Sequence, residues 1–338
     1  MNLISRFLAD GFCRQWPAAA GLITFGAVAT IACGQPTSAM ASRSAPATVW
    51  SAAERAGSFD LLSVDMVDPS HGWAVGEIGP RDSGGVVWTT TDSGRHWARL
   101  AAVAGVATSV HFVNQRTGWI AGYAGRIDRT DDGGVSWRAQ RPEGAREVFN
   151  SISAVDDQRA WAVGANGLGA RTVDGGATWM PMTLGVTADL WSVRFFTAER
   201  GWAVGTGGAI VTTRDGGATW TAARSGTTQT LFGLALAAPE IVLAVGDRGT
   251  VLRSDGGSVW MRSSTPVDAA LYSVAGSGRV VWAVGARGAA IRSDDAGASW
   301  RTVAPITDET LRGLVLMDPR HGAAVGRKGY VQWLQGEE

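Results

Sequence analysis

The sequence predicts an all-β fold, a seven-bladed β-propeller with four antiparallel strands in each blade. The 338 residues contain 16 Trp against 9 Phe and 3 Tyr, together with 46 Gly. Trp is normally the rarest aromatic residue, so this excess indicates one repeated use of Trp and a repeated need for tight turns. Outside the N-terminal segment, no stretch keeps a helical period without Gly interruptions. A helix-free repeat of about 41 residues is typical of propeller blades.

Two columns of Trp define the repeat. The first column ends segments of the type Asp-x-Gly-x-x-Trp, at intervals of 40 to 42 residues, and contains Trp97, Trp137, Trp179, Trp220, Trp260 and Trp300. The second lies in Trp-Ala-Val-Gly and related segments, in five copies, and contains Trp73, Trp119, Trp161, Trp202 and Trp282. Leu243 and Ala323 fill the same place in two further copies, which gives seven copies in all.

The fourth copy shows the four expected strands of one blade. Strand a is an apolar run with a small residue at its centre, at 190–195, and strand b is the Trp-Ala-Val-Gly segment at 201–205. The G-x-x-G segment at 205–208 predicts a tight hairpin turn into strand c, at 208–213. Strand d then begins at Trp220.

The N-terminal part of the propeller is expected to close the ring. The seventh copy runs to Trp333 and Glu338 without an Asp-box or a strand d, whereas 47–51, which contains Trp50, precede the first strand a. We expect this segment to pair with the last C-terminal strand, because pairing removes the open edges that an incomplete ring would have. The predicted propeller domain is 42–338, and we expect a monomer.

Residues 1–41 are expected to form a leader and a short linker. The first 16 residues carry Arg6 and Arg14 against one Asp, and residues 17–33 carry no charge. This pattern predicts a secretory signal. The apolar stretch is shorter than the roughly 20 residues of a spanning helix, although an uncleaved anchor is the alternative. The protein is therefore expected to be exported, to the periplasm or the extracytoplasmic face of a membrane.

Two processing sites remain open. Residues 29–33 resemble the lipobox of bacterial lipoproteins, although Thr30 stands where Leu is usual, and this site would make Cys33 the lipidated N-terminus. Residues 39–41, Ala-Met-Ala, form a competing site for ordinary signal peptidase. Both cysteines lie in the leader, so Cys33 has no disulfide partner in the body of the protein, and lipidation would explain its presence.

The recurring aspartates of the Asp-boxes are expected to be structural. A carboxylate in such a turn accepts backbone N–H groups, Gly supplies a positive φ, and the following Trp packs between blades. A catalytic pair would occupy unique positions, whereas these residues recur. They are Asp92, Asp132, Asp174, Asp215, Asp255 and Asp295.

Charge and residue counts exclude other functions. A net charge of zero argues against a general nucleic-acid binder. None of the four His residues lies at metal-ligand spacing, and His71 and His321 recur in the same Asp-Pro-x-His-Gly turn, so they are interpreted as turn residues. We expect no cofactor and no metal.

Residues 201–220 resemble the repeat of the photosystem II stability/assembly factor family, and the resemblance extends over the whole predicted mature chain. It implies an exported, non-enzymatic seven-bladed propeller that assists photosystem II assembly in photosynthetic membranes. The alternative is a BNR-type glycosidase or carbohydrate-binding propeller, because Asp-boxes also occur in sialidases. Sialidases need an arginine triad and a Tyr nucleophile, and the tyrosines here, Tyr123, Tyr272 and Tyr330, lie in no recognisable catalytic setting.

A candidate partner-binding surface follows from the positions at which the copies differ, because repeated residues form the scaffold. The residue before the small residue of strand a is aromatic or basic in the last four copies, and the G-x-x-G turns become basic late in the chain. Basic residues with aromatic anchors are typical of protein interfaces. The candidate residues are Trp191, Phe232, Tyr272, Arg312, Arg248, Arg287, Arg327 and Lys328. The predicted function is a non-catalytic scaffold or assembly factor that binds a protein, such as a membrane protein or an envelope complex.

Overall fold

The computed structural model describes residues 48–50, 54–55, 59–78, 84–304 and 307–336. Chain contacts separate 1–44 from 45–338, and only the second unit is described here. The predicted signal sequence, both processing sites and Cys33 lie outside the described residues. No helix in the described part of the chain is long and apolar enough to cross a membrane.

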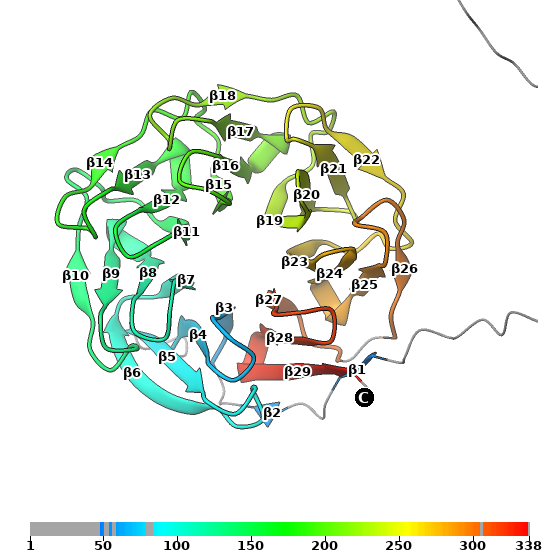
Figure 1. The fold of residues 1–338 in the computed structure, drawn as a ribbon, viewed down its shortest axis with the longest axis horizontal. Coiled ribbons are helices and arrows are strands. Elements are labelled where there is room, and N and C mark those ends of the chain that lie inside the picture. Colours follow the sequence, from blue (N-terminus) through cyan, green and yellow to red (C-terminus); the bar gives the residue numbers. More distant parts are fainter. Residues whose placement is uncertain (1–47, 51–53, 56–58, 79–83, 305–306, 337–338) are drawn as a thin grey trace, which may run out of the picture. The chain divides into compact units, whose positions relative to one another are not determined.

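Seven antiparallel sheets form a ring of blades around a channel (Figure 1), so the predicted all-β propeller is confirmed. Blade 1 contains β3 (Leu61–Met66), β4 (Gly72–Glu77), β5 (Gly84–Thr90) and β6 (Ala98–Ala104). Blade 2 contains β7 (Ala107–Phe112), β8 (Gly118–Gly122), β9 (Ile127–Thr130) and β10 (Arg138–Gln140). Blade 3 contains β11 (Phe149–Ala154), β12 (Ala160–Gly164), β13 (Gly169–Thr172) and β14 (Met180–Pro181). Blade 4 contains β15 (Leu190–Phe195), β16 (Gly201–Gly205), β17 (Ile210–Thr213) and β18 (Thr221–Ala222).

The remaining blades follow the same order from the channel outward. Blade 5 contains β19 (Leu231–Ala238), β20 (Ile241–Gly246), β21 (Val251–Asp255) and β22 (Met261–Ser263). Blade 6 contains β23 (Leu271–Ser277), β24 (Val280–Gly285), β25 (Ala290–Ser293) and β26 (Arg301–Thr302). Blade 7 contains β27 (Leu311–Leu316), β28 (His321–Gly326) and β29 (Tyr330–Gly336). Single 3₁₀ turns occupy five G-x-x-G segments: η1 (Tyr123–Gly125), η2 (Ala165–Gly167), η3 (Thr206–Gly208), η4 (Ala286–Gly288) and η5 (Arg327–Gly329).

N-terminal strands complete the seventh blade. β1 (Thr48–Trp50) pairs antiparallel with β29, with Trp50 opposite Leu334. β2 (Glu54–Arg55) pairs further along the same strand, with Arg55 opposite Tyr330. The backbone therefore places the N-terminal strands on the outer edge of the last blade. The side chain of Trp50 lies outside the described residues.

Tryptophans of strand b pack flat against the neighbouring blade. The ring of Trp73 in blade 1 stacks on Phe112 in blade 2, with centroids 3.6 Å apart and planes at 7°. The Asp-box Trp137 then meets the same Phe112 edge-on at 6.0 Å. Blades 3 and 4 repeat this arrangement with Trp161, Phe195 and Trp220. Stacked aromatic rings add to the apolar burial of each contact, so these tryptophans hold neighbouring blades together.

The same tryptophans also donate hydrogen bonds to the next Asp-box. The Nε1 atom of Trp73 donates to the carbonyl of Gly133 at 2.8 Å, and that of Trp161 donates to the carbonyl of Gly216 at 2.9 Å. The side chains are nearly fully buried. One residue type therefore supplies both the apolar and the polar contact between blades, which explains its frequency in the sequence.

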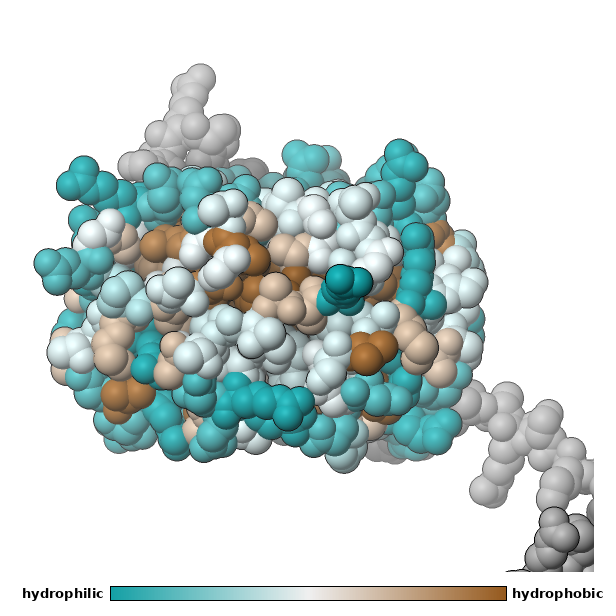
Figure 2. Space-filling model, turned by 90° about the horizontal axis from the view of Figure 1, so that it is seen from above, coloured by the Kyte–Doolittle hydropathy of each residue, from teal (hydrophilic) through white to brown (hydrophobic). Residues whose placement is uncertain are grey.

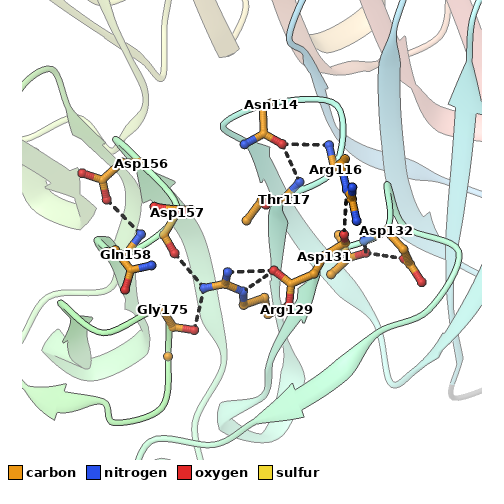
Figure 3. A network of polar contacts seen from close by, with 12 residues as sticks. Asn114, Arg116, Thr117, Arg129, Asp131, Asp132, Asp156, Asp157, Gln158 and Gly175 are labelled. Atoms are coloured by element: carbon orange, nitrogen blue, oxygen red, sulfur yellow. Dashed lines mark hydrogen bonds and ion pairs between the residues drawn. The ribbon is translucent and has the colours of Figure 1, made fainter.

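An arginine at the third position of strand c forms a further contact between blades. Arg129 on β9 has 10% of its side chain exposed and lies over the ring of Trp119, with Cζ 5.0 Å from the centroid. Figure 3 shows its guanidinium reaching the third blade, where Nη1 donates to the carbonyls of Asp157 at 2.7 Å and Gly175 at 2.8 Å. Its other nitrogens bind the carboxylate of Asp131. Arg171 reaches the carbonyl of Gly216 in the same way.

Asp-box carboxylates are occupied inside their own turns. In blade 2 the Asp132 carboxylate accepts the backbone N–H of Ser136 at 3.0 Å and its hydroxyl at 2.6 Å. Thr130 donates its hydroxyl to the same carboxylate and accepts the backbone N–H of Gly134, both at 2.8 Å. The pattern recurs, with His96 in place of the hydroxyl residue in blade 1. Its other members are Asp92, Asp174, Asp215 and Asp295.

Asp255 does not take this place, and its assignment to the Asp-box group is corrected here. The ladder pairs Val245 with Val251 in blade 5 and Val204 with Ile210 in blade 4, so Ser254 stands where Thr213 stands and the turn is one residue shorter. The missing residue is the Asp of the box. The Ser254 hydroxyl instead donates to the carbonyl of Val259. The Asp255 carboxylate, 70% exposed, pairs with Arg253 at 3.1 Å.

The Asp-boxes predict a loss of stability in acid. Hydrogen bonds from the hydroxyl and the backbone N–H of the residue four positions on lower the pKa of Asp132, Asp174 and Asp215 to about 2. An unfolded Asp titrates near pKa 3.9, so the stabilisation is complete above about pH 4 and is lost as the pH falls toward 2. A triple Asn variant should lose less stability than the wild type over that window, measured by urea unfolding at pH 6, 4 and 2.5. Equal pH slopes for the two proteins would contradict this assignment.

The outer edge of the ring carries exposed polar residues along its two rims (Figure 2). Figure 2 views the propeller edge-on, and hydrophilic residues gather along its two rims, with residues of intermediate hydropathy and several hydrophobic ones between them. Both residues of β18 and of β26 are exposed. The outermost strands of these two blades are therefore exposed to solvent.

Candidate functional site

A β-bulge in strand a of every blade turns one side chain toward the channel. In blade 4 the ladder pairs Leu190 with Gly205 and then Ser192 with Val204, so Trp191 between them has no partner on β16. A bulge leaves its extra residue outside the ladder and can re-aim its side chain. The same shift occurs in all seven strands. We call the seven bulged residues the mouth ring: Leu62, Thr108, Asn150, Trp191, Phe232, Tyr272 and Arg312.

The mouth ring lines one cavity of about 510 Å³ at this end of the channel. Its predicted members form a continuous arc. The ring centroids of Trp191 and Phe232 lie 6.0 Å apart, and those of Phe232 and Tyr272 lie 5.1 Å apart. Arg312 completes the arc with Cζ 4.5 Å from the centroid of Tyr272. The structure thus brings these four residues together. Trp191 is 39% exposed, and its Nε1 donates to Thr206 at 3.3 Å.

The other half of the mouth ring contains two polar residues, Thr108 and Asn150, beside Leu62. Thr108 donates its hydroxyl to the carbonyl of Phe149 at 2.6 Å, and Asn150 donates its amide to the carbonyl of Leu190 at 2.9 Å. Each bond crosses to the next blade, as the aromatic contacts do in the other half. Tyr123 on η1, 51% exposed, also lines the cavity. The cavity therefore has an aromatic wall and a wall of hydrogen-bonding groups.

The four basic residues of the turns lie at the same end of the propeller and do not line the cavity. Each turn follows the end of strand b, which pairs with the start of strand a, as Gly326 pairs with Leu311. Two of the cations are engaged: Arg327 lies 3.4 Å from the Asp60 carboxylate, and Lys328 lies 2.8 Å from Glu309. Arg248 and Arg287 are exposed. The predicted basic patch is thus a set of separate turn tips, partly neutralised by acidic neighbours.

Comparisons with known proteins agree with this architecture. Residues 101–186, which contain blades 2 and 3, match a family described as photosynthesis system II assembly factor YCF48. A solved structure described as YCF48 bound to D1 peptide superposes with a TM-score of 0.72 at 22% identity, covering 87% of this chain and all of that one. YCF48 from Cyanidioschyzon merolae gives 0.67 at 20% identity, covering 84% and 99%. The chain is therefore a seven-bladed propeller similar in fold to YCF48, and two of its blades match the YCF48 family model.

The likeness to more distant propellers concerns the fold alone. The WD40 domain of Doa1 superposes with a TM-score of 0.69 at 13% identity, covering 87% of this chain and 98% of that one. No curated protein sequence matches the chain. A ring of blades hosts many unrelated functions, so function has to follow from particular residues, here those at the mouth of the channel.

Sequence reasoning missed three members of the mouth ring, together with Tyr123. Leu62, Thr108 and Asn150 occupy the column that singled out Trp191, and aligning all seven copies at that column would have found them. Their side chains differ in character from blade to blade, which concealed the common position. Tyr123 precedes the left-handed residue of its turn, and its approach to the cavity depends on the curvature of the ring.

The turn cations occupy strained backbone. Arg248 and Arg287 have φ of 52° and 53°, at a turn position where five blades place a left-handed residue other than Gly and blade 4 uses Gly207. A side chain in this region costs about 1 to 2 kcal/mol. The variant Arg248→Gly should therefore unfold with a free energy equal to that of the wild type or about 0.5 kcal/mol higher, because relief of strain offsets the chain entropy of Gly.

Arg248→Val is the matched control for that change. It also removes the charge, but a β-branched residue fits poorly at positive φ. Urea unfolding should rank Gly at or above wild type and Val below it. A Gly variant that is less stable than the wild type by 1 kcal/mol would show that the Arg248 side chain makes a stabilising contact.

Proposed function

We propose that this YCF48-like propeller acts as an assembly factor that binds a protein segment at the mouth ring. The observation that carries the proposal is the arc of Trp191, Phe232, Tyr272 and Arg312 around one cavity. Trp, Tyr and Arg are the residue types that most often dominate binding energy at protein interfaces. A cavity rather than a flat patch favours a narrow occupant, such as an extended segment or a chain terminus.

The proposed partner is a subunit of a photosynthetic membrane complex. The resemblance of blades 2 and 3 to the YCF48 family and the superposition on YCF48 bound to D1 peptide support this partner class. We further propose export of the protein through its N-terminal leader, with lipidation at Cys33 or cleavage after Ala41. Export would place the propeller on the extracytoplasmic side of the membrane, where it could contact extracytoplasmic segments of a membrane protein.

We also propose that the protein is not an enzyme. A glycosidase needs two carboxyl groups facing one cleft, one of them with a raised pKa. Among the described residues that line the mouth cavity, Asp189 is the single carboxylate. Glu199 and Glu240 line a shallow pocket elsewhere with Arg200 and Arg214. There, hydrogen bonds from Arg200 lower the pKa of Glu240, which does not suit a general acid.

The proposal is tested by site-specific photo-crosslinking in cells that express the protein. A photoreactive residue at position 191 should capture a membrane-complex subunit, whereas one at Met261, which is 59% exposed on β22, should not. Equal capture at the two positions, or capture at neither, would contradict a binding site at the mouth.

Binding strength gives the quantitative version of this prediction. Trp191→Ala should weaken the affinity for a D1 peptide by about 30-fold, the effect of losing about 2 kcal/mol at an interface anchor. Met261→Ala should leave the affinity unchanged, measured by fluorescence anisotropy of a labelled peptide. If position 191 captures a partner but the protein does not bind the D1 peptide, the proposed site stands and the proposed partner is wrong.

A further inference from the structure

The opposite mouth of the channel holds a second cavity, of about 480 Å³, that is polar on one side and apolar on the other. Its polar side comes from the fifth residues of strand a in blades 1, 2 and 4, which are Asp65, His111 and Arg194. Blades 5 to 7 place small or branched apolar residues in the same column, and these are Ala235, Ala275 and Val315. The fifth residue of strand a differs from blade to blade, so the repeat itself does not specify a polar side and an apolar side.

His111 separates two opposite charges in this cavity. Arg194 Nη1 lies 3.2 Å from His111 Nδ1, and the Asp65 Oδ2 atom lies 3.7 Å from the same nitrogen. Burial lowers the pKa of His111, the Asp65 charge acts in the opposite direction, and the Arg194 charge lowers it further. The imidazole is therefore neutral, and it accepts the hydrogen bond from Arg194 at Nδ1.

Neither charge has an oppositely charged partner among the described residues. No carboxylate of that part of the chain lies within 4.0 Å of the Arg194 guanidinium, and no Arg or Lys lies within that distance of Asp65. Asp65 uses Oδ2 to accept the backbone N–H of Phe112 at 2.7 Å. Charges that are partly buried beside apolar residues gain from pairing, because the local dielectric constant is lower than that of water.

The spacing of the two charges suits one small molecule. Arg194 Nη1 and Asp65 Oδ2 are at most about 6.9 Å apart, since both lie close to the same ring nitrogen. An α-amino acid carries its ammonium and carboxylate groups on the same carbon, and with a charged hydrogen bond of about 2.8 Å at each end it can bridge a gap of up to this size. The cavity volume lies in the range of small-molecule sites, about 300 to 1,000 Å³.

We propose that this second mouth binds a small zwitterion with an apolar side group, the chemistry of an apolar α-amino acid. Arg194 binds the carboxylate, Asp65 binds the ammonium group through its other oxygen, and the apolar side group lies against blades 5 to 7. The proposal does not depend on the function proposed for the first mouth, because the cavities at the two mouths have no lining residue in common.

Isothermal titration calorimetry of the full propeller with L-leucine tests the site. Leucinamide lacks the carboxylate, 4-methylpentanoate lacks the ammonium group, and glycine lacks the side group, so each should bind at least tenfold more weakly than leucine. Absence of heat with millimolar leucine, or equal affinity for leucine and its two single-charge analogues, would overturn the proposal.

Two variants assign the charges to their residues. Arg194→Gln keeps a donor to His111, and Asp65→Asn keeps an acceptor for the Phe112 N–H, so both preserve the local hydrogen bonds. Each should lower leucine affinity at least tenfold, while Arg248→Gly at the other end of the propeller should not change it. Wild-type affinity for leucine in both charge variants would overturn the assignment of the charges to these residues. If either variant fails to fold, the comparison of leucine with its analogues tests the site instead.

Discussion

Replacing Gly285 by Ala is expected to lower the free energy of unfolding by about 3 kcal/mol or more. A Cβ atom on Gly285 would lie 1.9 Å from the carbonyl oxygen of Ala270, which is backbone and cannot rotate away. That oxygen also accepts the backbone N–H of Ala286 at 2.9 Å, so a shift would weaken a turn that closes the blade. Forcing an atom into filled space costs several kcal/mol when the surroundings are fixed. Urea unfolding of the variant measures the loss.

Gly278→Ala in the same blade is the control for that substitution. Gly278 has φ of +61° and no atom within 4 Å of an added Cβ, so the cost is backbone strain alone, about 1 kcal/mol. Equal losses for the two variants would mean that general chain strain, and not the contact with Ala270, makes the glycine necessary. The last Gly of strand b meets the same obstacle in every blade, which explains its presence in all seven copies.

Arg129→Ala is expected to cost about 3 kcal/mol of stability. The guanidinium of Arg129 is buried and satisfies the carbonyls of Asp157 and Gly175 in the next blade (Figure 3). Removing the donor leaves two partly buried acceptors without it, at about 1 to 3 kcal/mol each, and uncovers the ring of Trp119. The ion pair with the half-exposed Asp131 contributes little to this total. Thermal and urea unfolding both measure the effect.

Arg116→Ala serves as the matched control, because Arg116 lies close to the same Asp131 and is exposed. Its Nε donates to the Asp131 carbonyl at 3.4 Å, a long bond in contact with water. We expect a change below about 0.5 kcal/mol. A loss for Arg116→Ala as large as that for Arg129→Ala would show that contact with residue 131, and not the bridge between blades, carries the stability.

Most of the fold follows from the sequence because each blade needs the same residues at the same places. The spacing of Trp137 and its equivalents, and the G-x-x-G turns such as 205–208, place the strands within a few residues of the observed ones. Steric demand enforces this regularity: Gly285 cannot carry a Cβ, and Trp73 must match Phe112 in the next blade. Because these contacts recur in every blade, the residues that make them recur in the sequence, and the repeat can be recognised from the sequence alone.

The site was predictable only in part, for reasons that particular residues illustrate. Trp191, Phe232, Tyr272 and Arg312 were found because large residues at a variable position are conspicuous, whereas Asn150 at the same position was not. The bulge that aims them at the channel depends on strand pairing, which no single strand reveals. Asp255 was assigned to the Asp-box group because Trp260 keeps the spacing, although the turn before it is one residue shorter.

The bulges also place the mouth ring outside the strand ladders that hold each blade together. A mouth-ring residue such as Phe232 contributes nothing to the ladder of its blade, since Leu231 and Gly233 make the pairing on either side. Substitution there can change shape and charge at the channel while the neighbouring blades stay in place. Seven such positions surround one opening of the channel, one in each blade. If the mouth binds a partner as proposed, a change of specificity can arise by point mutation at these positions without a new loop.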